Sequence, residues 1–302
     1  VLRPLARHLG GEERSLRRGP GLELAELREY EPGDDVRRID WNASARATRP
    51  FVREAHVQRA LDAWLVVDVS ASLDWGTALC LKRERALEFI AVAGQLLGRQ
   101  GNKLAALPFA DRPLGLVPPG GGRVQLLRLL AAVDAARSQA RKGTTDLAAA
   151  LALADGIVRR RSLVLVVSDF LVAEGWQGPM RRLAGRHETI AVRLVDPRES
   201  DLPDVGLVTL EDPETGDQLT VDTSDRGLRQ RFRAAYRAQT ERIATDLARC
   251  GVDLLTLSTG DGLLPALSDF LGARDRRRAR GAAPRRQGQG GRTAPAAVAA
   301  TA

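Results

Sequence analysis

The feature that most constrains the fold is a short apolar run that stops at an aspartate. Residues 61–73 read LDAWLVVDVSASL, in which four apolar residues precede Asp68, and Ser70 and Ser72 follow at every second position. Such a run is typical of a strand buried on both faces of a mostly parallel sheet. Ligands of these sheets bind just beyond the carboxyl ends of the strands. Carboxylate and hydroxyl oxygens suit a hard cation such as Mg²⁺, so the sequence indicates a metal site at this strand end.

Similar apolar runs recur and alternate with helical patterns. Further strands are expected at 104–109, 162–167, 189–195 and 252–258. Stretches with apolar residues at helical spacing lie at 78–99, 124–136, 147–159, 227–249 and 263–271. A short edge strand at 114–117 and a hairpin with its turn at 213–217 complete the pattern. This alternation predicts an α/β fold, a doubly wound, mostly parallel sheet flanked by helices.

Composition divides the chain into three expected parts. A small β-rich extension covers residues 1–60, the α/β domain covers 61–272, and a disordered basic tail covers 273–302. The extension is short and highly charged, so we expect it to pack against the main domain. The tail is rich in arginine and carries most of the net charge of +8. It either binds an anionic partner such as nucleic acid or stays unfolded because it has little to bury, and we favour the second interpretation.

The cysteines and the apolar runs indicate a compartment. Cys80 and Cys250 are far apart and lie in helical patterns, which fits a reducing compartment without a disulfide scaffold. Three scattered histidines argue against a His/Cys zinc site. No apolar run approaches the roughly 18 residues of a membrane helix, and the first residues lack a signal-peptide core. We therefore expect a cytoplasmic protein without a membrane span.

Two later segments place oxygen-bearing side chains at comparable positions. Thr144 and Thr145 precede the predicted helix 147–159, and Asp169 directly follows a fully apolar strand. The carboxyl ends of parallel strands meet at one edge of a sheet, so we expect these residues to converge there with the first group. A simpler explanation is that Asp68 caps the next turn and that the serines only begin a helix.

The combined pattern resembles the metal-ion-dependent adhesion site of von Willebrand factor A-type domains. The matching residues are Asp68, Ser70, Ser72, Thr145 (which completes a Gly-x-Thr motif) and Asp169. The resemblance implies a Mg²⁺ ion, or Mn²⁺, bound directly by the serine hydroxyls, directly or through water by the threonine, and mainly through water by the aspartates. Such an ion keeps an open position that a partner's Glu or Asp can fill. In that family glycine usually follows the last aspartate, whereas Phe170 stands here.

A second resemblance lies upstream. The stretch from Arg28 to Trp41, REYEPGDDVRRIDW, is similar to the signature of a bacterial family called domain of unknown function 58. In that family the signature precedes a von Willebrand factor A-type domain by about this distance. The resemblance implies a partner of MoxR-type AAA+ ATPases that acts in chaperone-like maturation or assembly of client proteins.

The signature itself has two interpretations. It is either a partner-docking element or a buried network of ion pairs that fixes the N-terminal strands to the main domain. We favour the network, with Trp41 in the core. The tentative partner-binding residues are Arg28, Tyr30, Asp35, Arg37, Asp40 and Trp41.

These features favour a noncatalytic, metal-dependent protein-interaction protein over an enzyme. The main alternative is a Mg²⁺-dependent phosphohydrolase that uses Asp68 and Asp169. Aspartyl phosphatases, however, need a second acid two residues after the nucleophile, and position 70 is serine. No Ser/His/Asp order or Cys/His pair points to another hydrolase. Nucleic-acid binding through the arginine-rich tail is the remaining alternative.

Overall fold

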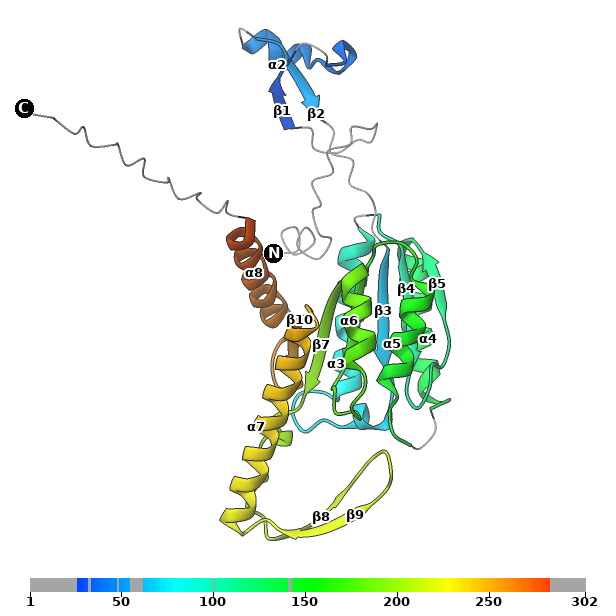
Figure 1. The fold of residues 1–302 in the computed structure, drawn as a ribbon, viewed down its shortest axis with the longest axis vertical. Helices are drawn as coiled ribbons and strands as arrows, with labels where there is room; N and C mark the ends of the chain where they lie inside the picture. Colours follow the sequence, from blue (N-terminus) through cyan, green and yellow to red (C-terminus); the bar gives the residue numbers. More distant parts are fainter. Residues whose placement is uncertain are drawn as a thin grey trace, which may run out of the picture.

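A computed structural model of the chain describes residues 26–31, 34–47, 49–54, 62–99, 101–140 and 143–282 (Figure 1). The strands are β1 (Glu26–Glu29), β2 (Phe51–Glu54), β3 (Ala63–Asp68), β4 (Leu104–Phe109), β5 (Val117–Gly120), β6 (Leu163–Ser168), β7 (Glu188–Val195), β8 (Leu207–Glu211), β9 (Gln218–Asp222) and β10 (Asp253–Ser258). The α-helices are α2 (Trp41–Arg46), α3 (Lys82–Gly98), α4 (Gly122–Arg137), α5 (Leu147–Ile157), α6 (Gln177–Arg186), α7 (Arg226–Arg249) and α8 (Leu263–Ala282). Three short 3-10 helices are η1 (Val36–Arg38), η2 (Ala71–Asp74) and η3 (Pro197–Glu199).

The main domain is built on a six-stranded sheet with the order β10-β7-β6-β3-β4-β5. All neighbours in this sheet pair in parallel except β4 and β5, which are antiparallel. Helices cover both faces (Figure 1). This confirms the predicted α/β fold with a mostly parallel sheet.

Both faces of the sheet are buried, which explains the continuous apolar runs. Successive residues of a strand point to opposite faces. In β3, Leu65 joins a core cluster with side chains of α3, α4 and α8, whereas Trp64 and Val66 join a second cluster with α5, α6 and α7. Burying each such aliphatic side chain contributes about 1.5–3 kcal/mol, so the sheet is held firmly from both sides.

The topology directs attention to the junction between β3 and β6. From β3 the chain passes through α3 to β4 on one side, whereas from β6 it passes through α6 to β7 on the other side. The strand order therefore reverses between these two central strands. In open α/β sheets such a switch point is where ligands bind, beyond the carboxyl ends of the strands. Asp68 ends β3 and Asp169 follows β6, so the two predicted aspartates flank this point.

Several element boundaries differ from the predicted ones. The edge strand β5 begins at Val117, where the expected strand ended, and α3 starts only at Lys82. Helix α8 continues to Ala282, ten residues past the predicted start of the disordered tail. Arg274, which we had assigned to that tail, is buried and pairs with Glu188 and Asp253. The first part of the basic segment therefore belongs to the fold, and residues 283–302 lie outside the described residues.

The described part of the N-terminal extension forms a small unit of its own. Strands β1 and β2 pair antiparallel, and their extensive contacts are with each other and with η1 and α2. Pro32 and Gly33 of the upstream signature lie outside the described residues. Among the helices that the structure describes, none combines the length and the apolar character needed to span a bilayer.

Candidate metal centre

The end of β3 brings three predicted ligands together. Asp68 is buried, and its Oδ1 accepts a hydrogen bond of 2.9 Å from the Ser70 amide. The Ser70 and Ser72 hydroxyls lie 3.0 Å apart at the start of η2. Ser70 precedes η2 but its side chain makes no capping hydrogen bond, so capping does not account for this hydroxyl. The Asp68 carboxylate accepts a hydrogen bond from the turn, as in the simpler explanation, and the two serine hydroxyls lie together as a hydrogen-bonded pair.

Asp169 lies beside Asp68 at the end of β6 and is already paired with a cation. Its Oδ2 is 3.0 Å from the Nζ of Lys82, which is the first residue of α3. The same ammonium group also pairs with Glu199 of η3, and Lys82 is almost fully buried. Burial alone would lower the pKa of Lys82, but the two carboxylates outweigh it and raise that pKa, so the ammonium stays charged.

Asp68, in contrast, forms no ion pair with a described residue. Ser168 donates to its Oδ2 at 2.7 Å, and Ser70 also forms hydrogen bonds with this carboxylate, including the one from its amide described above. Burial, and then the neighbouring charge of Asp169, raises the pKa of Asp68 to about 7, although the hydrogen bonds from both serines act in the opposite direction. A buried carboxylate without a counter-charge is costly, and a cation beside it would remove that cost.

Thr145 stands at the neighbouring loop, before α5. Its position is fixed because the amide of Asp146 donates to the carbonyl of Ala110, at the end of β4. The side chain of Thr145 is buried, and its hydroxyl donates at 2.6 Å to Glu214, in the turn between β8 and β9. The structure therefore places Thr145 at the same edge of the sheet, with a carboxylate from elsewhere in the chain as its partner.

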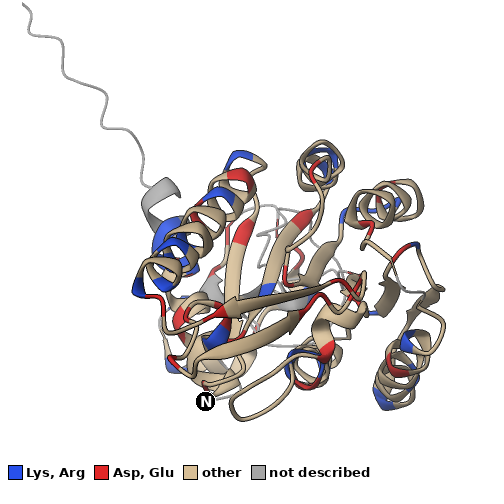
Figure 2. Cartoon of the chain, turned by 90° about the horizontal axis from the view of Figure 1, so that it is seen from below, with Lys and Arg blue, Asp and Glu red and all other residues tan. Residues whose placement is uncertain are grey.

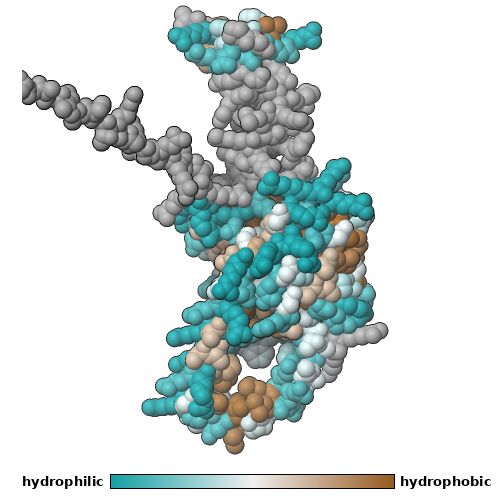
Figure 3. Space-filling view, in the orientation of Figure 1, coloured by the Kyte–Doolittle hydropathy of each residue, from teal (hydrophilic) through white to brown (hydrophobic). Residues whose placement is uncertain are grey.

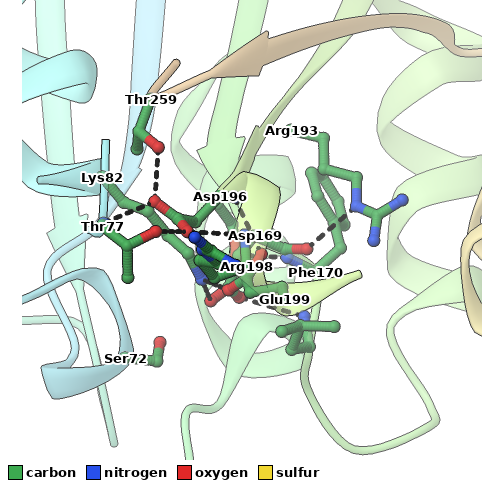
Figure 4. A network of polar contacts seen from close by, with 12 residues as sticks. Ser72, Thr77, Lys82, Asp169, Phe170, Arg193, Asp196, Arg198, Glu199 and Thr259 are labelled. Carbon is green, nitrogen blue, oxygen red and sulfur yellow. Dashed lines mark hydrogen bonds and ion pairs between the residues drawn. The ribbon is translucent and has the colours of Figure 1, made fainter. Parts of the chain in front are cut away.

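A second buried carboxylate network adjoins Asp169 (Figure 4). Asp196 follows β7 and accepts hydrogen bonds from the hydroxyls of Thr77 and Thr259 and from the amide of Thr77. Burial alone would raise the pKa of Asp196, but these hydrogen bonds prevail and hold it below its usual range. The network ties the ends of β7 and β10 to the loop before α3, and so supports the helix that carries Lys82.

Phe170 stands where the resembled family usually has glycine, and its backbone has a conformation that favours glycine. The φ angle of Phe170 is +59°, in the left-handed region that glycine adopts without cost. The phenyl ring is buried and packs edge-on against Trp176, with ring centroids 5.8 Å apart. The packing of the ring offsets the strain of the backbone.

Substitutions of Phe170 are expected to separate these two effects. Phe170→Ala keeps the strained backbone and loses the ring, which should cost about 3–5 kcal/mol of unfolding free energy. Phe170→Gly loses the same ring but relieves about 1–2 kcal/mol of left-handed strain. Urea unfolding should therefore rank the glycine variant as the more stable of the two. The reverse order would show that the backbone at this position is not strained.

The residues of the upstream signature act mainly as turn and helix caps in this structure. Asp35 accepts from the amide of Arg37, and Asp40 accepts from the amides that begin α2. The Tyr30 amide donates to the carbonyl of Pro50 across the small sheet. Arg28 lies in β1, and its side chain is outside the described part of the structure.

Trp41 contradicts our expectation for that signature. Its side chain is 70% exposed at the start of α2, because a two-stranded sheet and one short helix cannot cover an indole ring. The interpretation of Trp41 as a core residue was therefore wrong. The roles of these residues in partner binding stay predictions.

Four residues of the site were not predicted from the sequence: Lys82, Ser168, Glu199 and Glu214. Lys82 did carry a signal, since lysine is rare in this arginine-rich chain and here falls within a mostly apolar helical pattern. Ser168 directly precedes Asp169 and could have been included with it. Nothing local distinguishes Glu199 and Glu214, because their partners are distant in the sequence.

Fold and site together define the class of protein. A six-stranded, mostly parallel sheet with helices on both faces, and with hydroxyl and carboxylate side chains at the carboxyl ends of its central strands, is a von Willebrand factor A-like α/β domain. The family is given by comparison with known sequences. A family model described as "Protein of unknown function DUF58" matches residues 26–242, which is most of the chain. The chain belongs to this family.

The chain is also similar to known relatives and, more distantly, to solved structures. Uncharacterized proteins of Mycobacterium tuberculosis and Mycobacterium bovis are each 40% identical over 273 residues, covering 89% of this chain and 84% of theirs. Among solved structures, the conserved hypothetical protein BatB from Bacteroides thetaiotaomicron is 14% identical, with a TM-score of 0.49 over 72% of this chain and 99% of that one. The SpRpn10 VWA domain is 11% identical, with a TM-score of 0.38 over 70% and 95%. These structural likenesses are distant and carry no functional argument.

Proposed function

We propose that the chain is a noncatalytic protein-interaction module whose binding site is a Mg²⁺ or Mn²⁺ ion held at the end of β3. The observation that carries this proposal is Asp68, a buried carboxylate beside a second carboxylate and a pair of hydroxyls, with no described cation of its own. Oxygen ligands of this kind fit a hard divalent cation. Lys82 already neutralises Asp169, so Asp68 is the carboxylate whose charge a bound ion would neutralise.

The ligands divide into inner and outer groups. Ser70 and Ser72 would hold the ion with their hydroxyls, and Asp68 and Asp169 would supply negative charge around it. Thr145 would complete the set from the adjacent loop. When bound, the ion supplies a positive centre that accepts a carboxylate from another protein. The chain's own residues would orient this centre at the carboxyl edge of the sheet.

The surroundings of Asp68 support binding rather than catalysis. A cavity of about 30 Å³ lies next to Asp68 and Ser70, between η2, α3 and α4. This volume accommodates water-sized groups beside the carboxylate. The serine at position 70 also lacks the acidity that phosphoester cleavage by Asp68 would require.

The first test is the unfolding temperature in increasing Mg²⁺ or Mn²⁺. A ligand that binds only the folded protein stabilises it by about 1.4 kcal/mol at ten times its Kd, which is a shift of a few degrees for a domain of this size. The wild type should show this shift and Asp68→Asn should not. Asp269→Asn, which changes an exposed carboxyl on α8, is the matched control and should respond like the wild type. Equal shifts in all three proteins would place the metal elsewhere.

The partner that the family resemblance implies is a MoxR-type AAA+ ATPase, and it should be tested as a purified protein. We expect the wild type to bind it in Mg²⁺ and Asp68→Asn to bind at least tenfold more weakly, since about 1.4 kcal/mol corresponds to a factor of ten. The variant is a better control than a chelator, because a chelator also removes Mg²⁺ from the ATPase. Equal binding by both proteins would contradict a role of the metal in this interaction.

A further inference from the structure

The carboxylate of Glu214 is held by both donors of one site residue. The amide of Thr145 donates to Oε2 at 3.1 Å, and the Thr145 hydroxyl donates to Oε1 at 2.6 Å. The two residues are 69 positions apart in the sequence, so the contact joins the tip of the β8–β9 hairpin to the loop before α5. Two donors that grip both oxygens of a carboxylate form a specific carboxylate-binding site.

The turn that carries Glu214 is held by hydrogen bonds between its own residues. The Asp212 side chain accepts from the amide of Glu214 at 2.8 Å, and the Asp212 amide donates to the carbonyl of Asp217 at 2.8 Å. Gly216 has a φ of +80°, which lets the turn close. Hydrogen bonds within the turn therefore hold the backbone from which the Glu214 side chain extends.

The rest of the hairpin is only weakly attached. At its base, Thr223 is buried and its amide and hydroxyl donate to the carbonyl of Gly206. Between base and tip, strands β8 and β9 contact mainly each other, and Leu207 and Leu219 are 75% and 64% exposed. Figure 3 shows apolar surface at this lower end of the molecule. An isolated two-stranded hairpin is marginally stable, so its tip can leave Thr145 without disturbing the core.

The hairpin also has the charge of a ligand for a cation site. Residues 207–222 include five acidic side chains and no basic one (Asp and Glu are red in Figure 2). The carboxylate of Asp68 alone would repel these charges. A cation beside that carboxylate reverses the interaction and attracts the acidic turn.

We propose that Glu214 is an internal ligand of the candidate metal centre, and that the β8–β9 hairpin is a latch which a partner must displace. This rests on the proposed function, because it assumes that the centre recognises carboxylates. The Thr145 oxygen can offer a lone pair to a cation while its proton goes to Glu214, so metal and hairpin bind together. A partner carboxylate competes with Glu214 for the same place. The partner therefore presents a glutamate in an acidic turn similar to the hairpin tip, residues 211–217.

The contact itself is tested by hydrogen exchange of the Thr145 amide in the full chain, followed by NMR. Glu214→Ala removes the acceptor, so exchange of this amide should become about tenfold faster. Asp217→Ala removes one negative charge from the same turn and should leave the rate unchanged. Equal rates in the wild type and in Glu214→Ala would overturn the proposal.

The competition is tested with a labelled synthetic peptide that copies residues 210–219. If the latch is closed about nine-tenths of the time, the apparent Kd of the wild type is about tenfold weaker than that of Glu214→Ala. In Mg²⁺ we therefore expect the peptide to bind Glu214→Ala about ten times more tightly than the wild type or Asp217→Ala. A peptide with glutamine in place of its central glutamate should not bind. Equal affinity of all three proteins, or binding of the glutamine peptide, would overturn the latch.

The metal titration separates this inference from the proposed function. If Mg²⁺ stabilises the wild type while Glu214→Ala and Asp217→Ala bind the peptide alike, the metal centre stands and the latch is wrong. If Mg²⁺ has no effect but Glu214→Ala still frees the Thr145 amide and binds the peptide, the latch stands on Thr145 alone and the metal centre is wrong.

Discussion

Replacing Lys82 by methionine should destabilise the protein by about 3–5 kcal/mol, because it leaves a buried carboxylate and a half-buried one without their shared cation. Asp169 and Glu199 both pair with the Lys82 ammonium, and the lysine and Asp169 side chains are almost fully buried. Methionine has a similar length and fits the space, so the loss reports charge and not packing. In a domain of this size it should lower the unfolding temperature by roughly 10 °C.

Lys103→Met is the matched control for this experiment. Lys103 is exposed next to β4, so the same substitution there should change stability by less than about 0.5 kcal/mol. Urea unfolding of both variants in chelator gives the comparison without a metal contribution. A loss of less than about 1 kcal/mol in Lys82→Met would mean that the carboxylates find another counter-charge, and the electrostatic description of the site would fail.

The main sheet could be predicted from the sequence because its signals are local. A strand buried on both faces must be continuously apolar, and the runs ending at Asp68 and Asp169 meet that requirement. The rule that ligands bind at the carboxyl edge then places both aspartates at one end of the sheet. The order of the strands was not needed for this step, since any parallel arrangement brings these ends to the same edge.

The partners of the site could not be predicted because they depend on packing between distant segments. Lys82 reaches a carboxylate 87 positions away, and Glu214 reaches Thr145 across 69 positions. Arg274 was misjudged for the same reason. Its arginine-rich neighbourhood resembles an unfolded tail, whereas its partners on β7 and β10 hold it in a helix. Composition describes a segment alone and contains no information on what lies beside it.

The second large effect is expected at Asp68, in the dependence of stability on pH. The pKa of this carboxyl rises from 3.8 to about 7 on folding, chiefly because the group is buried and then because Asp169 is near. The folded protein therefore binds the proton more tightly than the unfolded chain. Protonated Asp68 therefore stabilises the folded protein. By linkage, this stabilisation is complete below the unfolded pKa of 3.8 and is lost as the pH rises from about 4 to about 7.

Asp68→Asn should abolish this loss in metal-free protein. Asparagine resembles the protonated carboxyl and can still accept from the Ser70 amide, while its amide group can donate to the Ser168 hydroxyl. The variant should match the wild type near pH 4 and exceed it by about 4 kcal/mol near pH 8, since each pKa unit corresponds to about 1.4 kcal/mol. Urea unfolding in chelator across this range measures the difference, with Asp269→Asn as the exposed control. Parallel curves for wild type and Asp68→Asn would mean that Asp68 already has a counter-charge, and the argument that it requires a metal ion would then fail.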